Sequence, residues 1–260
     1  MPELATAVSE IRLRFGEQAV LRASRLAAIE PWPSGLEPVD RLSGIDGLPR
    51  GRLTVLSGHG TCGKLSVDLD LLARGSRELS QVVLVDPSLT FDPWTLAALG
   101  GDLERVLAIR PPAPDACGEA ALALARAGCG LLVVLLPARV LAAAEAWLPS
   151  LEGAAGRSGS VVVAIAEDVP PALAHSSSFT LGLERVEWLV AAGEPVGLRA
   201  RLRCLKNRVG VPGRETELEV RYPLNCTFAG KGAISEPLLR TFAGKREEGS
   251  EEWQARSAAG

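Results

Sequence analysis

The sequence predicts an α/β fold with a mostly parallel central sheet, helices on both faces and antiparallel strands added at the C-terminal side. Three observations predict it. Between residues 53 and 166, short strand-like segments alternate with helical ones, and several of the strands are apolar throughout, as strands covered on both faces are. A glycine-rich loop follows the first strand and opens a helix. After residue 179, strand patterns follow one another directly, which is typical of antiparallel hairpins.

Length and composition fit a globular protein of this class. A chain of 260 residues is long enough for one large α/β domain or two small ones. Aromatic residues make up only 4% against 47% hydrophobic residues, so we expect an aliphatic, alanine-rich core. The net charge of −3 gives no overall basic signal, and any nucleic-acid contact would need a local basic patch.

Cysteine usage and hydropathy indicate a protein of the cytoplasm. The five cysteines are scattered without a C-x-x-C pair and only two histidines are present, so we expect neither a zinc site nor disulfides. Buried free thiols in a reducing cytoplasm are the expected state of Cys62, Cys117, Cys129, Cys204 and Cys226. The charged N-terminus is not typical of a signal peptide and no apolar run reaches membrane-spanning length, so no membrane contact is expected.

The first 33 residues are expected to form an N-terminal helical arm and a linker. Residues 4–29 show helical periodicity, interrupted at Gly16, and the segment 31–33 (Pro-Trp-Pro) ends the arm. Its first apolar stripe consists of Leu4, Val8, Ile11 and Phe15. Such a stripe packs either on its own domain or on a neighbour, and composition alone favours its own domain.

The core is expected over residues 34–230, and proline or glycine closes most of its elements. The expected elements up to residue 166 are a capped helix and turn over 34–47, a strand over 53–56, a helix from Lys64 to 77, a strand over 81–86, a helix over 92–100, a strand over 106–109, a helix over 118–127, a strand over 131–136, a helix over 138–148 and a strand over 160–166.

The C-terminal part is expected to add strands and then lose regular structure. Segments 179–191, 198–206 and 216–222 show strand patterns, with turns at 193–195 and 211–213. Residues 231–260 are expected to be a tail with one last helix over 235–242, and the charged segment after 244 is expected to be largely disordered.

The glycine-rich loop is a candidate phosphate-binding loop. Gly58, Gly63 and Lys64 have the spacing G-x-x-x-x-G-K, in which backbone N–H groups and a helix N-terminus surround phosphate oxygens. With Gly60, they are the candidate cofactor-binding residues, in a vestigial form. A Ser or Thr that binds Mg²⁺ should follow the lysine, but Leu65 does. Ser66 comes one residue later, which turns its side chain about 100° away on a helix.

The order of the motifs resembles that of the RecA recombinase family. The segments that carry the resemblance are 11–25, similar to the N-terminal helix of RecA; 47–52, similar to the lead into its Walker A loop; 85–93, similar to its next strand and turn; and 206–222, similar to its last core strands. The resemblance covers roughly residues 11–222 and implies a RecA-like P-loop NTPase core.

The departures from that family fall where ATP would be hydrolysed. Leu65 replaces the Mg²⁺-binding hydroxyl, and Ser88 stands where the family has a catalytic glutamate, although serine cannot replace a carboxylate as the general base. Leu136 stands at the expected place of the Walker B acid. The sequence therefore predicts no catalytic residue, no metal site and no required cofactor, and ATP binding is not favoured.

The expected DNA contacts are also reduced. The loop over 168–178, which matches a DNA-binding loop of the family, contains no Lys or Arg, and phosphate contacts dominate DNA affinity. One strand carries a basic alternation, but a solvated sheet face explains it better than DNA binding: Arg199, Arg201, Arg203, Lys206 and Arg208. DNA contact is expected to be weak or indirect.

A RecA-like chain with a degenerate nucleotide site resembles the ImuA family of translesion-mutagenesis accessory proteins. The resemblance implies a non-catalytic adaptor of the bacterial DNA damage (SOS) response that binds RecA and the Y-family polymerase-like partner ImuB, with self-association as a further expectation. Residues 4–29 would dock on a RecA-like neighbour. Trp253 in the acidic tail is either a partner-binding residue or a stray aromatic.

Two alternatives remain for the loop. The first is a RecA-like, DNA-dependent ATPase or recombinase in which Ser66 reaches the metal and Asp86 or Glu167 serves as the base. Asp86, at a strand end, is better explained as a turn cap. The second alternative is nucleotide binding without hydrolysis, through backbone N–H groups and Lys64.

Overall fold

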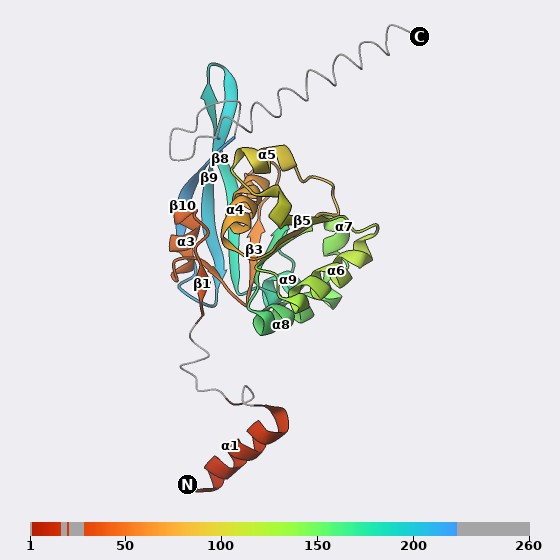
Figure 1. Ribbon diagram of the computed structural model, residues 1–260. Helices are drawn as coiled ribbons and strands as arrows, with labels where there is room; N and C mark the ends of the chain where they lie inside the picture. The colour runs from red at the N-terminus through yellow and green to blue at the C-terminus, as the bar shows by residue number, and fades with distance from the viewer. Residues whose placement is uncertain (1, 17–19, 21–28, 223–260) are drawn as a thin grey trace, which may run out of the picture.

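The computed structural model describes residues 2–16, 20 and 29–222, and the predicted α/β fold is confirmed (Figure 1). An eight-stranded sheet has the order β10-β9-β8-β3-β7-β6-β4-β5. The predictions for the remainder of residues 16–29 and for everything after 222, including the helix over 235–242, Cys226 and Trp253, lie outside the described residues.

Six neighbouring strands of this sheet are parallel, and the last two add antiparallel pairs. The parallel set is β3 (Leu53–Ser57), β4 (Val82–Val85), β5 (Val106–Ile109), β6 (Leu131–Leu136), β7 (Val161–Ala166) and β8 (Phe179–Ala191). The antiparallel strands are β9 (Glu194–Asn207) and β10 (Glu215–Arg221). Figure 1 shows the β8–β9 hairpin extending beyond the body of the domain. The three predicted C-terminal strands are thus present.

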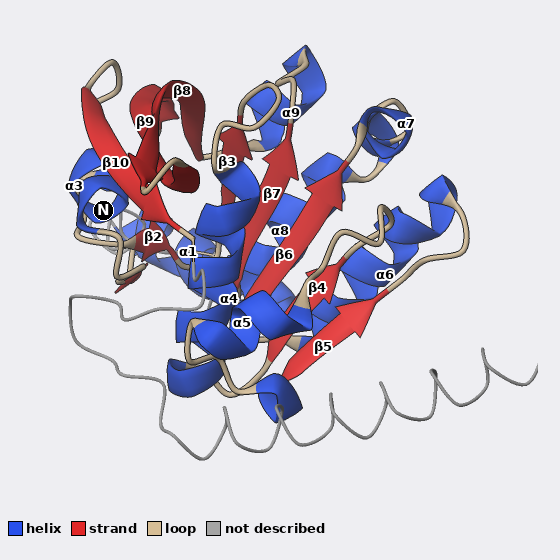
Figure 2. Cartoon of the chain, turned by 90° about the horizontal axis from the view of Figure 1, so that it is seen from above, coloured by secondary structure: helices blue, strands red, loops and turns tan. Residues whose placement is uncertain are grey.

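Helices cover both faces of the parallel part of the sheet (Figure 2). On one face, α4 (Lys64–Glu78) and α5 (Pro93–Ala98) lie over the parallel strands, and α3 (Glu37–Ser43) packs on β9 and β10. The other carries α6 (Pro114–Ala127), α7 (Ala138–Leu141), α8 (Leu148–Ser158) and α9 (Pro171–Ser176). Short 3₁₀ turns lie at η2 (Leu103–Arg105) and η3 (Ala144–Ala146).

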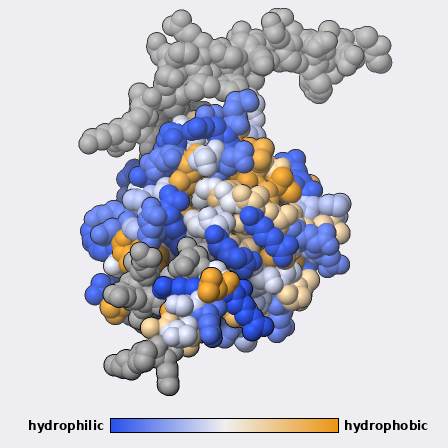
Figure 3. All heavy atoms as spheres, turned by 60° about the horizontal axis from the view of Figure 1, so that its bottom comes forward, coloured by the Kyte–Doolittle hydropathy of each residue, from blue (hydrophilic) through white to orange (hydrophobic). Residues whose placement is uncertain are grey.

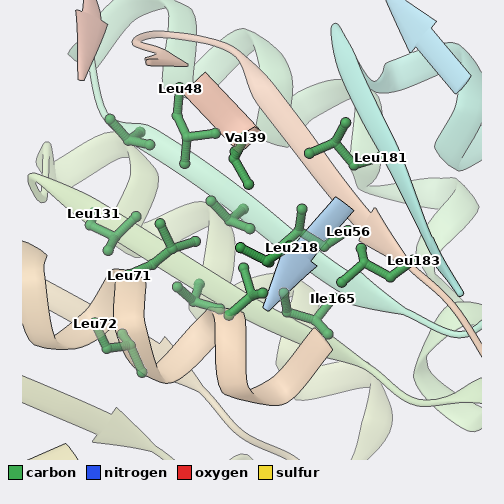
Figure 4. Close-up of a cluster of buried hydrophobic side chains, with 14 of the residues drawn as sticks. Val39, Leu48, Leu56, Leu71, Leu72, Leu131, Ile165, Leu181, Leu183 and Leu218 are labelled. Carbon is green, nitrogen blue, oxygen red and sulfur yellow. The ribbon is translucent and has the colours of Figure 1, made fainter. Parts of the chain in front are cut away.

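Two aliphatic cores lie on opposite sides of the sheet because successive strand residues point to opposite faces. On β6, Leu131, Val133 and Leu135 pack on the α4 side, where the core also includes Phe179. Figure 4 shows Leu131 of this core near Leu71 and Leu72 of α4. The alternate residues Leu132, Val134 and Leu136 pack on the side of α6 and α8. These doubly buried strands are the ones that the sequence predicted from their unbroken apolar runs.

The helix predicted over 138–148 is wrong in its extent. The structure divides this region into α7 and η3 and then begins α8 at Leu148, a helix that the sequence analysis missed. Pro149 lies in the first turn of α8, where the missing N–H of proline costs no hydrogen bond within the helix. The helix α9 was likewise expected to be part of a loop.

The segment expected as a linker is joined to the core. Strand β1 (Pro31–Trp32) pairs with β2 (Leu48–Pro49), and Trp32 is 3% exposed. The Trp32 indole N–H donates to Glu78 of α4 at 3.2 Å. The core therefore begins before residue 34.

Helix α1 (Pro2–Phe15) is confirmed and ends at Gly16, which has a φ of 91°. Its apolar stripe is exposed, however, with Leu4 at 69%, Ile11 at 40% and Phe15 at 66%. The expectation that this stripe packs on its own domain is therefore not met.

Hydrophobic residues on the face shown in Figure 3 form separate small patches among hydrophilic ones. The four cysteines that the structure describes are buried free thiols, as expected: Cys62, Cys117, Cys129 and Cys204. Among the described residues, no helix has both the length and the apolar character needed to span a bilayer.

If α8 completes the second core, Leu151→Ala should lower the free energy of unfolding by about 2–4 kcal/mol, because Leu151 is fully buried against the sheet. Urea unfolding followed by circular dichroism measures it. Leu13→Ala, at a side chain that is 88% exposed, is the matched control and should change stability by less than about 0.5 kcal/mol. Equal effects of the two substitutions would contradict this packing.

Candidate functional site

The candidate site lies at the carboxyl ends of the parallel strands, on the side that α4 covers. The loop 58–63 leaves β3, Asp86 follows β4, and Glu167 follows β7. Because carboxyl ends of parallel strands meet at one edge of a sheet, these segments come together around the N-terminus of α4.

The backbone of the loop requires glycine at two positions. A Cβ at Gly58 would collide with the Leu183 carbonyl oxygen and lie 2.6 Å from the Cys62 Sγ. Gly63 caps α4 with a φ of 92°, a conformation that other residues rarely adopt. The Cys62 N–H already donates to the Gly60 carbonyl at 3.1 Å within the loop.

Lys64 is engaged by the protein itself. Its Nζ donates to the Gly60 carbonyl oxygen at 3.1 Å and lies 3.8 Å from the Glu167 Oε1. The Lys64 side chain is only 12% exposed, whereas that of Glu167 is 59% exposed. The candidate residues Gly58, Gly60, Gly63 and Lys64 are thus brought together, with a carboxylate beside the lysine.

The position that should hold a metal-binding hydroxyl is apolar and open. Leu65 is 41% exposed at the first turn of α4. Among the described residues, no group of three His, Cys, Asp or Glu side chains could hold a metal ion. Leu65 cannot bind Mg²⁺, because an aliphatic side chain has no oxygen atom that could coordinate a cation.

Asp86 is committed to holding its own turn. Its buried carboxylate accepts bonds from the Ser88 N–H at 3.1 Å, the Thr90 hydroxyl at 3.4 Å and the Phe91 N–H at 2.8 Å. Arg139 of α7 donates to the Pro87 carbonyl at 2.5 Å. The interpretation of Asp86 as a turn cap is confirmed, and these bonds leave it poorly placed to act as a base on a bound ligand.

The structure corrects the residue that stands for the Walker B acid. Leu136, the expected position, packs into the core on the α6 and α8 side. The side chain at the end of β6 that shares the α4 face is Leu135, which is 5% exposed. A side chain of β6 that faces the loop must therefore lie on the same face of the strand as Leu135.

A buried acid that the sequence analysis missed lies beneath the site. Asp68 of α4 is 3% exposed, and its Oδ1 has no hydrogen-bond partner in the described structure. Burial, and secondarily the nearby Asp86 carboxylate, raises the pKa of Asp68 to about 8. The sequence contained a signal for this burial: Asp68 follows Lys64 by four residues, and Leu72 follows Asp68 by four, so the three side chains share one face of the helix. Asp68 is therefore protonated at neutral pH.

A groove of about 670 Å³ adjoins the loop. Loop residues 57–61, the segment 167–169 and the β8 and β9 side chains Glu184, Arg185 and Arg201 contribute to its lining. Arg185 donates to the Thr61 carbonyl at 3.1 Å, and its guanidinium lies 4.6 Å from the centre of the Trp188 ring. Both signs of charge are present, so the groove has no uniformly cationic character.

The basic alternation on β9 is largely neutralised by neighbouring strands. Arg199 lies 2.6 Å from Glu187 of β8 and 3.0 Å from Glu219 of β10, and Arg203 lies 3.3 Å from Glu215. Beyond the end of the β9–β10 pairing, Lys206 and Arg208 donate to carbonyl groups at the end of α9. These contacts fit the interpretation of the basic strand as a solvated face of the sheet. A face on which arginine side chains lie next to glutamate side chains attracts phosphates weakly.

If Asp68 is buried in its neutral form, Asp68→Asn should stabilise the protein at alkaline pH. The raised pKa favours the folded state most below the unfolded value of 3.8, and this contribution is lost as the pH rises to about 8. Asparagine, which does not ionise, should remove that loss and raise the free energy of unfolding at pH 8 by about 2 kcal/mol or more.

Urea unfolding between pH 4 and pH 9 measures this effect. Asp70→Asn is the matched control on the same helix, because burial raises the pKa of Asp70 only to about 6. Asp70→Asn should reduce the pH dependence of the free energy of unfolding below pH 6. It should leave the decrease in that free energy between pH 6 and pH 8 unchanged. An unchanged slope in Asp68→Asn between pH 6 and 8 would show that Asp68 is ionised in the folded protein.

Comparison with known proteins agrees with the fold. The family model of the RecA N-terminal domain matches residues 2–150. Protein RecA of Symbiobacterium thermophilum is 29% identical over 257 residues, covering 83% of this chain and 72% of that protein. Protein RecA of Oceanobacillus iheyensis is 27% identical over 272 residues, covering 90% of this chain and 76% of that protein. With more than half of its length matched by the family model, the chain belongs to the family of the RecA N-terminal domain.

Proposed function

We propose that this chain is a non-catalytic RecA-like accessory protein of the bacterial DNA damage (SOS) response, acting as an adaptor in error-prone translesion synthesis. In this role it binds RecA and a Y-family polymerase-like partner of the ImuB type. The family membership supports the RecA-like core, and the finer assignment rests on the sequence resemblance to ImuA proteins.

One observation carries the proposal: a preserved fold surrounds a site that has lost its chemical groups. Leu65, Ser88 and Leu135 stand where a phosphoryl-transfer site needs a metal-binding hydroxyl, a general base and a metal-orienting acid. Such sites act by positioning and electrostatics, so three apolar or uncharged substitutions leave little to stabilise the transition state.

The exposed stripe of α1 supports a role in protein contacts. Leu4, Ile11 and Phe15 are exposed on a helix that carries Arg12 and Arg14 in its last turn. An amphipathic helix with an open apolar face is suited to a groove on another protein. In the proposed function this face docks on a RecA-like neighbour, either RecA or a second copy, and any DNA contact is indirect.

The alternative is a DNA-dependent ATPase or recombinase with an atypical site, and the names of the relatives favour it. Its candidate bases differ in availability, since Asp86 is fully buried in its turn whereas Glu167 is 59% exposed. Glu167 lies beside Lys64, however, and this contact is better suited to holding the lysine than to activating water.

Cytoplasmic location remains part of the proposal.

Phosphate release from ATP with Mg²⁺, with and without single-stranded DNA, separates the two functions. The proposal expects no release above background under either condition, because the chain lacks the groups that bind the metal and activate water. RecA assayed in parallel is the positive control. Turnover that disappears in Lys64→Ala would contradict the adaptor proposal and support the ATPase.

Binding to RecA should depend on the stripe of α1. The double substitution Ile11→Asp/Phe15→Asp should weaken binding at least about tenfold, because charges would enter an apolar contact. Calorimetry with purified RecA measures the affinity. Leu13→Asp is the control, since Leu13 is 88% exposed and lies off the stripe. Equal affinity of the wild type and the double variant would exclude α1 from the contact.

A further inference from the structure

The contact between Lys64 and Glu167 places a carboxylate where the loop would otherwise meet a phosphate. The Lys64 Nζ lies 3.8 Å from the Glu167 Oε1, and its bond to the Gly60 carbonyl folds the side chain back over the loop. We propose that Glu167 is a built-in counter-ion that excludes anionic ligands from the phosphate loop. This inference rests on the proposed function, in which the loop serves no hydrolysis.

The fold explains why Glu167 reaches the loop. Residues Val161, Val163 and Ile165 of β7 face the α4 core, so the next residue of that parity after the strand is Glu167. Strand β7 lies directly beside β3, with Ser57 opposite Ala166, and the Gly58 N–H donates to the Ala166 carbonyl at 3.3 Å. The side chain of Glu167 therefore starts beside the loop and needs no rearrangement to meet Lys64.

The contact between Glu167 and Lys64 affects the binding of anionic ligands more than it affects the stability of the fold. Because the Glu167 side chain is 59% exposed, its pairing with Lys64 is screened by water and contributes little to folding. A phosphate bound at Lys64 would lie beside the same carboxylate, however, and two like charges a few ångströms apart repel each other. The bond to the Gly60 carbonyl also occupies one of the three N–H donors of the Lys64 ammonium group.

A second carboxylate adds to the same effect. Asp168 lies 3.1 Å from the Nε2 of His59 at the tip of the loop, and both side chains are more than 70% exposed. The two acids that follow β7 thus both contact the loop, and the negative potential that they create opposes phosphate binding. Since Glu167 contacts Lys64, whose side chain is only 12% exposed, we expect Glu167 to contribute more to this effect than Asp168.

Calorimetric titration with ATP, and separately with inorganic pyrophosphate, tests the inference at low ionic strength and without Mg²⁺. Glu167→Gln keeps the size of the side chain and removes its charge, so affinity for both probes should rise at least about tenfold over the wild type. Glu184→Gln is the matched control, because Glu184 lines the same groove from β8, where its cross-strand partner is Arg201 of β9. It should change affinity by less than about twofold.

The outcomes separate this inference from the proposed function. A gain in Glu167→Gln that disappears in Glu167→Gln/Lys64→Ala would support the inference. No gain in Glu167→Gln, with the variant folded by circular dichroism, would overturn it and leave the adaptor proposal intact. An equal gain in Glu184→Gln would also overturn it, since the effect would then be general charge removal. Hydrolysis of ATP by the wild type would overturn the adaptor proposal, whichever way the Glu167 comparison came out.

Discussion

The close approach of the loop after β3 to strand β8 is the constraint on which the site depends. A side chain at Gly58 would occupy the space of the Leu183 carbonyl and the Cys62 thiol, and one at Gly63 would crowd Leu198 of β9 in a left-handed backbone conformation. Both glycines are therefore required to turn the strand into α4, whether or not a phosphate binds. This requirement explains how the loop keeps the glycine pattern of a nucleotide site while the residues that handle metal and water have changed.

The charges around the loop follow from the same geometry. Parallel strands deliver Asp86 and Glu167 to one edge of the sheet, where a nucleotide-binding protein would have a bound phosphate and metal ion to balance such acids. Here the protein balances them internally. Asp86 accepts three hydrogen bonds from its own turn, Glu167 meets Lys64, and Asp68 takes up a proton instead of a charge.

Much of the fold could be predicted from the sequence, because buried parallel strands are apolar throughout and their ends carry proline or glycine. The failures have local causes. Pro149 lies in the first turn of α8, where it is tolerated, and Trp32 enters the core through a two-residue strand too short to show periodicity. At the site, Leu136 was chosen without knowing the face of its side chain, and Asp68 could not be recognised as buried until α4 was placed on the sheet.

The arginine strand shows why charge must be judged across strands. Along the chain, Arg199, Arg201 and Arg203 form a basic stripe of the kind that binds phosphates. In the sheet their cross-strand partners on β10 are Glu219, Glu217 and Glu215, so a column of three cations lies beside a column of three anions. A DNA backbone approaching these cations would also meet the glutamates, and a phosphate contact at Arg199 or Arg203 would have to compete with an ion pair. The sheet geometry thus places the basic residues of the sequence pattern opposite an equal number of acidic residues on the neighbouring strand.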